Sequence, residues 1–152
     1  MGYLRSPRAI HVPTTADDLR ASKIAALAEK RWRVETSGVT VVIGEDEIPV
    51  STRRGDDREA LHVAFSAINA GLRPDGATFK FADGIPRAMP NTNMIMCVAA
   101  ALAHVQGCFD HEAGLIGQIE DAEDASALHA IDIEAGWPST AYGRWQHSSS
   151  DE

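Results

Sequence analysis

Three side chains that could bind a metal lie at helical spacing in the second half of the chain. His104, Cys108 and His111 are four and three residues apart, so on a helix they occupy neighbouring faces. Zinc takes imidazole and thiolate ligands in a tetrahedral array, and this spacing supplies three candidates. No CxxC or HExxH pattern accompanies them, and a free cysteine in an apolar row is typical of a buried structural residue. The sequence therefore predicts no metal and no other cofactor.

The other candidates for catalysis are the two cysteines and the acidic residues. Cys97 or Cys108 as a nucleophile would need a base and a third, orienting group, and neither cysteine lies on a strand-to-helix elbow. The acidic residues at 120–124 are typical of a solvated helix end, and the acidic loop at 44–47 is not a phosphate-binding motif. The Arg-Gly-Asp triplet at 54–56 argues little for cell adhesion where no export signal is recognised. We expect no enzyme, and a small hydrolase is the least favoured hypothesis.

One long apolar-periodic stretch, residues 91–122, would position these side chains. Its large apolar residues recur at alternating spacings of three and four, which predicts a helix rather than a strand. Pro90 and a cap at Asn91 or Thr92 mark its start. At about 1.5 Å per residue the helix would be roughly 45 Å long. The stripe consists of Ile95, Val98, Leu102, Val105, Phe109, Glu112, Ile116 and Ile119, and a second row of Met94, Ala101, Cys108, Leu115 and Ala122 widens it into a face that packs on a core.

Small residues mark another face of the same helix. Ala100, Gly107 and Gly114 are seven residues apart. Glycine inside a helix costs about 1 kcal/mol relative to alanine. Two interpretations stay open: close approach of another helix or chain to this face, or an exposed face under weak selection. We take Gly107 and Gly114 as candidate interaction residues.

The remaining chain predicts an α+β fold with two short β-hairpins and about four helices, dominated by the central helix at about 91–122. A basic helix runs from about Ala16 to Val34 after a cap at Thr14 or Thr15. A hairpin at 39–52 and a second one at 78–89 flank a helix that starts at Asp56 or Asp57 and ends at Gly71. A short helix at 125–133 closes the domain, and Gly136-Trp137-Pro138 ends it.

Three parts of the chain follow from these elements: an extended N-terminal arm (1–14), a single α+β domain (15–138) and a polar C-terminal tail (139–152). Prolines and sparse apolar residues define the arm, and serines define the tail. The larger apolar residues near both ends are candidate contacts with other proteins. They are Tyr3, Leu4 and Ile10 in the arm, Trp137 as a core or interface anchor, and Trp145 in the tail.

Charge and composition narrow the classes of partner. The net charge is −8, with +3 in residues 1–35 and −11 in the remainder, so the acidic body argues against binding to nucleic acid. No uninterrupted apolar run reaches the roughly 18 residues of a membrane span, and we expect no membrane partner. Cys97 and Cys108, eleven residues apart on one helix, are too distant for a disulfide. Reduced thiols in a cytoplasm are therefore expected.

The segment from 104 to 138 resembles the C-terminal part of a domain family of unknown function found in bacteriophage tail and tail-fibre assembly proteins. The family pattern has a helix with His-Val-Gln-x-Cys-Phe-Asp-x-Glu, then an apolar helix end, then Ala-Ile-Asp-Ile and a closing Gly-Trp-Pro. The hairpins at 39–52 and 79–84 are similar too, and the likeness spans about 30–138. The matching residues are His104, Val105, Gln106, Cys108, Phe109, Asp110, Glu112, Ile131, Asp132, Ile133, Gly136, Trp137 and Pro138.

The resemblance implies a role in virion structure or virion assembly and brings no catalytic residues with it. The first hypothesis is a structural component of a phage tail, at the tip, the baseplate or the fibre attachment. The alternative is a tail-fibre assembly chaperone that leaves before the virion matures. Other tail proteins would be the partners, with a threefold or sixfold homo-oligomer or ring, in a virion made in the bacterial cytoplasm. Asp110 and Glu112 would then serve local roles, pairing with arginines or capping a turn.

Overall fold

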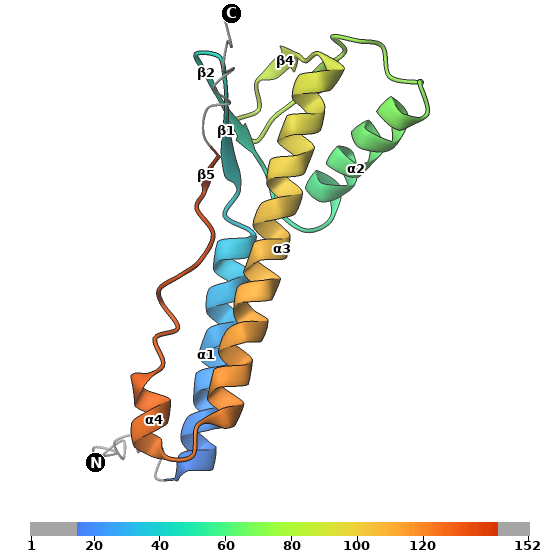
Figure 1. Cartoon of the computed structure of the whole chain (residues 1–152). Helices are drawn as coiled ribbons and strands as arrows, with labels where there is room; N and C mark the ends of the chain where they lie inside the picture. Colours follow the sequence, from blue (N-terminus) through green and yellow to red (C-terminus); the bar gives the residue numbers. More distant parts are fainter. Residues whose placement is uncertain (1–14, 143–152) are drawn as a thin grey trace, which may run out of the picture.

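A long antiparallel pair of helices forms the axis of the molecule. In the computed structural model, which describes residues 15–142, α1 (Ala16–Glu35) runs beside α3 (Asn91–Asp121) in the opposite direction (Figure 1). Thr15 starts α1, because its Oγ1 accepts a hydrogen bond from the N–H of Asp18 at 3.1 Å. The arm at 1–14, with Tyr3, Leu4 and Ile10, and Trp145 in the tail lie outside the described residues.

The other elements gather at the two ends of this pair. At one end lie a three-stranded sheet, a two-stranded hairpin and a helix that leans away from α3, and at the opposite end lies a short helix (Figure 1). These elements are β1 (Val39–Ile43), β2 (Asp46–Val50), α2 (Asp56–Asn69), β3 (Thr78–Lys80), β4 (Pro86–Ala88), α4 (Ala125–Ala130) and β5 (Ala141–Tyr142). The predicted α+β class is confirmed, with two hairpins and four helices, of which α3 is the dominant one.

The sheet contains one strand that the sequence did not indicate. The order is β2-β1-β5, with β2 antiparallel to β1 and β5 parallel to it. Thr40 donates its N–H to the carbonyl of Thr140 at 2.8 Å, just before Ala141 pairs with it. The described domain therefore reaches Tyr142, inside the segment predicted as a polar tail from residue 139.

Two hydrophobic clusters share α3 between them. The first joins the sheet and α2 to the N-terminal half of α3, and the second joins α1 and α4 to its C-terminal half. The first contains Val39, Val41, Ile48, Val50, Leu61, Ala64, Phe81, Met89, Met94, Cys97, Ala100 and Ala101, and the second contains Leu27, Leu115, Ile119 and Leu128. One helix thus ties both ends of the domain together.

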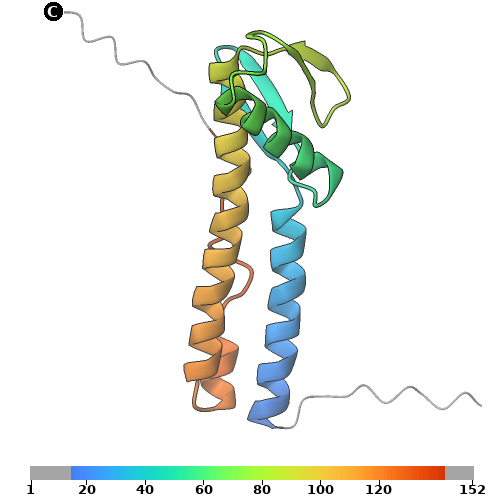
Figure 2. The same cartoon turned by 90° about the vertical axis from the view of Figure 1, so that its right-hand side faces the viewer.

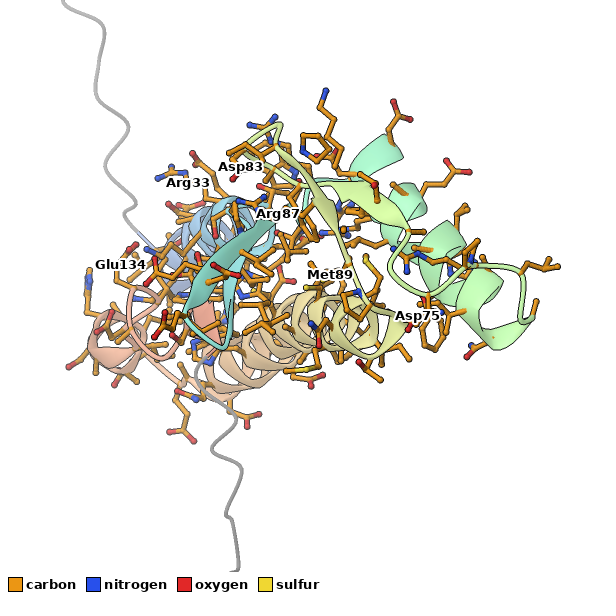
Figure 3. The ribbon with its side chains drawn as sticks, turned by 90° about the horizontal axis from the view of Figure 1, so that it is seen from above. Arg33, Asp75, Asp83, Arg87, Met89 and Glu134 are labelled. Carbon is orange, nitrogen blue, oxygen red and sulfur yellow. The ribbon has the colours of Figure 1, made fainter. Side chains whose placement is uncertain are left out.

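The start of α3 differs from the prediction. Pro90 is the N-cap residue, and neither Asn91 nor Thr92 caps the helix with its side chain. The N–H of Asn91 instead donates to Asp75 Oδ1 at 2.8 Å, and the Asn91 side chain pairs with Arg73. A carboxylate from the preceding loop therefore caps the helix, and its negative charge interacts favourably with the positive end of the helix dipole. Figure 3 shows Asp75 beside this end of α3 and Met89 pointing into the space between the hairpin and α3.

The hairpin of β3 and β4 carries its own ion pair at the turn. Arg87 donates to both carboxylate oxygens of Asp83, at 3.0 Å and 2.7 Å (Figure 3). Hydrogen bonds from Arg87 and from the Ile85 amide lower the pKa of Asp83 to about 2. The guanidinium carbon of Arg87 also lies 5.5 Å from the ring centroid of Phe81. Phe81 belongs to the first hydrophobic cluster, so this contact links the hairpin to that cluster.

Within residues 15–142, α3 alone is long and apolar enough to cross a membrane. In the fold it is the central helix, against which α1, α2 and β1 pack. A helix at the centre of a globular core meets the same length and composition criterion. The expected absence of a membrane partner stays a prediction.

Candidate interaction surface

A buried carboxylate gathers three arginines where α1 meets the loop before α2. Glu35 is fully buried at the C-terminal end of α1. Its oxygens lie 2.9 Å from Arg54 Nε, 2.7 Å from Arg58 Nη2 and 2.5 Å from Arg31 Nη1. Thr52 donates its hydroxyl to the Glu35 backbone carbonyl at 2.6 Å. We call Glu35, Arg31, Arg54 and Arg58 the Glu35 cluster.

The Glu35 cluster keeps its carboxylate charged. Burial alone would raise the pKa of Glu35, but hydrogen bonds from Arg54, Arg58 and Arg31 outweigh burial and lower it to about 2. Arg31 also pairs with Glu112 of α3 at 3.1 Å, so the cluster joins α1, α2 and α3. Its arginines are engaged with carboxylates already, which makes the cluster a structural tie rather than an open anion site.

The family resemblance implied that Asp110 and Glu112 pair with arginines or cap a turn, and the contacts agree with this for Glu112, which pairs with Arg31. Asp110 instead accepts a hydrogen bond from Gln106 Nε2 at 2.8 Å. The guanidinium carbon of Arg31 lies 5.7 Å from the ring centroid of Phe109, within cation–π range.

The predicted metal candidates do not converge on one point. His104 is fully buried with its Nε2 2.8 Å from the Val34 carbonyl oxygen, and Cys108 Sγ lies 4.0 Å from the same nitrogen. His111 faces elsewhere, with its Nε2 2.9 Å from the Ala135 carbonyl oxygen. Among residues 15–142 no group of three His, Cys, Asp or Glu side chains is arranged to hold a metal.

Neither cysteine is prepared for nucleophilic chemistry. Cys97 and Cys108 are free and fully buried, and burial raises the pKa of each thiol to about 11. A thiolate is the reactive form of cysteine, and a raised pKa removes it at neutral pH. Both cysteines therefore belong to the packing of α3.

Gly107 meets a segment of its own chain. After α4 the chain returns along the helix pair toward β5 (Figure 1). A Cβ added at Gly107 would lie 2.9 Å from Pro138 Cγ, and one at Gly136 would lie 2.7 Å from His111 Cε1. Trp137 lies between these contacts, with its ring edge-on to His111 at a 4.6 Å centroid distance and its Nε1 donating to the Ile133 carbonyl. We call residues 131–140 the return segment.

The predicted interaction residues thus fall into different settings. Gly107 faces Pro138, and the half-buried Trp137 packs onto the second hydrophobic cluster. Gly114 is exposed and has open space where a Cβ would be. Close approach to the small-residue face is therefore real at Gly107, and the return segment makes it. A contact of Gly114 or Trp137 with another protein stays a prediction.

The surface that the sequence did not single out is a groove between α2 and α3. It encloses about 440 Å³ and is lined on the α3 side by Ile95, Val98, Ala99, Ala101, Leu102 and Val105, and on the other side by Thr52, Arg58, Leu61, His62 and Phe65. Leu102 is 66% exposed, Ile95 38% and Phe109 37%. We call Ile95, Leu102 and Phe109 the α3 seam. Exposed apolar residues clustered in this way mark interaction sites more often than scattered ones do.

The α3 seam corrects one expectation. The sequence placed these three residues on the face packed against a core, but the fully covered row is the neighbouring one with Met94, Cys108 and Leu115. The two rows are about 100° apart on the helix, which is about the width of one apolar face, so their spacing alone could not tell which one the core covers. Exposure together with heptad spacing is the signal that distinguishes the α3 seam, and it needs the structure.

A family model for a domain of unknown function, DUF4376, matches residues 18–135. The chain belongs to the DUF4376 family. No curated protein and no solved structure matches the chain. The DUF4376 match contains the Glu35 cluster, the groove and the α3 seam, and it stops before Gly136-Trp137-Pro138.

Proposed function

We propose that this DUF4376 protein is a non-enzymatic structural component of a bacteriophage tail, at its tip, baseplate or fibre attachment. The observation that carries the proposal is the largely apolar surface of the groove and the α3 seam, which suits contact with another protein. The resemblance of residues 104–138 to domains of tail and tail-fibre assembly proteins supplies the context.

The chemistry of the described residues supports a role without catalysis. Cys97 and Cys108 have raised pKa values, Glu35 is held by arginines, and His104 lies against the Val34 carbonyl. Between residues 15 and 142 the candidate nucleophiles, bases and ligands are thus used in packing and hydrogen bonds. The hypothesis of a small hydrolase gains no support from them.

A tail-fibre assembly chaperone is the second candidate, and the shape of the groove is the observation that suits it. A chaperone must hold an apolar fibre segment for a limited time, and a preformed apolar groove between two helices suits an extended or helical segment. Both roles place the protein with other tail proteins, in the bacterial cytoplasm during assembly. A threefold or sixfold arrangement would follow from the symmetry of tails.

The test is the protein content of purified particles. Particles of the phage that encodes this chain would be banded on a density gradient, and the chain quantified by mass spectrometry against the major tail protein. A fixed ratio of a few copies per particle is the expected result, and the ratio would indicate the ring symmetry. Abundance in the lysate with absence from the particles would replace the structural role with the chaperone role.

A deletion of the gene completes the test. Loss of tails or of fibre attachment is expected for a structural subunit, and particles with tails but without folded fibres for a chaperone. Normal infectious particles after the deletion would overturn both roles.

A further inference from the structure

The α3 seam lies on a stretch of helix without charge. Residues 91–109 contain no Asp, Glu, Lys or Arg, and their one histidine, His104, is fully buried. The exposed side chains on this stretch are Thr92, Ile95, Ala99, Leu102, Ala103, Gln106 and Phe109. For a chain with a net charge of −8, an exposed uncharged stretch of this length is a surface on which two copies can meet without electrostatic repulsion.

One side of the helix pair is covered by α2 near the start of α3 and is open along the remainder (Figure 2). In Figure 2, α2 lies in front of the end of the pair that carries the sheet, and no described element lies in front of the remainder of α1 and α3. The return segment and α4 cover the opposite side. A pair of helices buries its apolar faces against further layers, and among residues 15–142 no layer covers this part of the pair.

We propose that a second copy of this chain covers the open side, through a two-fold contact between the two α3 helices in antiparallel orientation. The three seam residues are seven apart, so they line one face of the helix. An axis through Leu102 sets Leu102 against itself and Ile95 against Phe109 of the other copy. A two-fold contact requires such a self-complementary pattern, because the same patch serves both partners. The inference does not depend on the proposed function.

The groove supplies a receptor for the aromatic residue. In this register Phe109 of the second copy arrives beside Ile95, which lines the groove, and a cavity of about 440 Å³ has room for a phenylalanine ring. The ionisable side chains in the groove lining are Arg58 and His62, both of basic type. The exposed acidic residue next to Phe109 is Asp110, and the groove lining contains no carboxylate that would repel it.

The area that the contact can bury indicates a weak interface. From Ile95 to Phe109 the seam is about 21 Å long at 1.5 Å per residue. A face two helices wide, roughly 20 Å, then buries on the order of 400 Å² per copy, about half the area of a standard stable interface. We therefore expect a weak, reversible dimer rather than a permanent one.

The first experiment measures mass in solution against concentration. Sedimentation equilibrium of the full chain from 5 μM to 500 μM should show a transition from 16.3 kDa to twice that mass. Leu102→Glu should raise the dissociation constant at least about tenfold, because each substitution acts twice at the axis. Leu72→Glu is the matched control: Leu72 is 77% exposed, lies beyond the end of α2 and does not line the groove.

The second experiment tests the register. Leu102→Glu and Leu102→Lys should each be monomeric, because like charges meet at the axis, and a mixture of the two should dimerise because Glu then faces Lys. If Leu102→Glu does not fold, Ala99→Glu replaces it, because Ala99 is exposed and its small side chain contributes little to packing. This variant should weaken the dimer in the same way. Circular dichroism checks folding of every variant.

Three results would overturn the inference. The first is a wild-type chain that stays monomeric at 500 μM, even if another protein binds it. The second is a dimer that Leu102→Glu weakens no more than Leu72→Glu does. The third is a trimer as the smallest associated species. Monomeric Leu102→Glu and Leu102→Lys variants that do not associate when mixed would overturn the antiparallel register.

Discussion

The two sides of the α1–α3 pair are formed by the same helices but differ in the contacts that cover them. On the closed side the return segment packs directly against α3, with Pro138 on Gly107 and His111 on Gly136. On the other side, Leu102 is 66% exposed beside the groove with α2, and Arg31 of the Glu35 cluster lies 5.7 Å from the ring centroid of Phe109. The closed side combines close packing with an ion pair between Lys30 and Glu134 at 2.8 Å, whereas the other side is held by the buried ion pairs of the Glu35 cluster.

The difference shows how far the size of the residues on a helix face indicates whether that face packs within the chain or stays exposed. At Gly107 the small residue marks a place where another segment of the chain approaches α3, because a Cβ there would collide with Pro138, whereas Gly114 faces open space. Large uncharged residues that stay exposed mark a place that no segment within residues 15–142 covers. An outward Leu102 next to a groove is therefore a better guide to an intermolecular contact than the glycines are.

The largest effect is expected from breaking the ionic anchor of the open side. Glu35→Gln leaves three arginines around a neutral amide, and removing one partner of a buried ion pair costs about 3–5 kcal/mol of unfolding free energy. Urea denaturation at pH 7 would measure it. Glu29→Gln is the control on the same helix, since Glu29 pairs with Arg33 on the surface and its side chain is 65% exposed. That variant should not change stability measurably. Equal effects of the two substitutions would show that the Glu35 cluster does not anchor the open side.

The same carboxylate should make stability depend on pH. The folded pKa of Glu35 is about 2 and its ordinary value 4.5, so its contribution is fully present above pH 4.5 and disappears as the pH falls toward 2. A difference of 2.5 units corresponds to roughly 3 kcal/mol. The gap in unfolding free energy between the wild type and Glu35→Gln should therefore narrow by about that amount between pH 6 and pH 2, measured by urea denaturation at each pH. A gap independent of pH would mean that the carboxylate is not ionised in the folded state.

The sequence predicted the elements better than their partners. The spacing of apolar residues located α3, and the turn at 44–46 located the first hairpin, because both depend on residues close together in the chain. The contacts of Glu35 with Arg54 and Arg58 join residues 19 and 23 positions apart, on elements whose packing no local pattern specifies. Strand β5 was missed because two residues, Ala141 and Tyr142, carry no alternation to detect.

The candidate surface was predictable only in outline. The heptad rows of α3 are visible in the sequence, but the core covers one row and leaves the other exposed, and the two rows are about 100° apart, about the width of one packed face. The capping of α3 by Asp75 was invisible for a related reason. Asn91 is a good cap in isolation, but its side chain is engaged by Arg73 in the folded protein.

The smallest effect tests the closed side, with two glycines seven residues apart on one helix. Gly114→Ala should stabilise the protein by up to about 1 kcal/mol, because alanine has the better helix propensity and its Cβ meets open space. Gly107→Ala has the same gain in propensity but places a Cβ 2.9 Å from Pro138 Cγ, so it should be less stable than Gly114→Ala by about 1 kcal/mol or more. Thermal melts of both variants give the comparison. Adding Pro138→Ala removes the collision and should restore much of the difference, as a double-mutant cycle would quantify. Equal stabilisation by the two alanines would mean that the return segment does not hold its place on α3, and both sides of the helix pair would then be open.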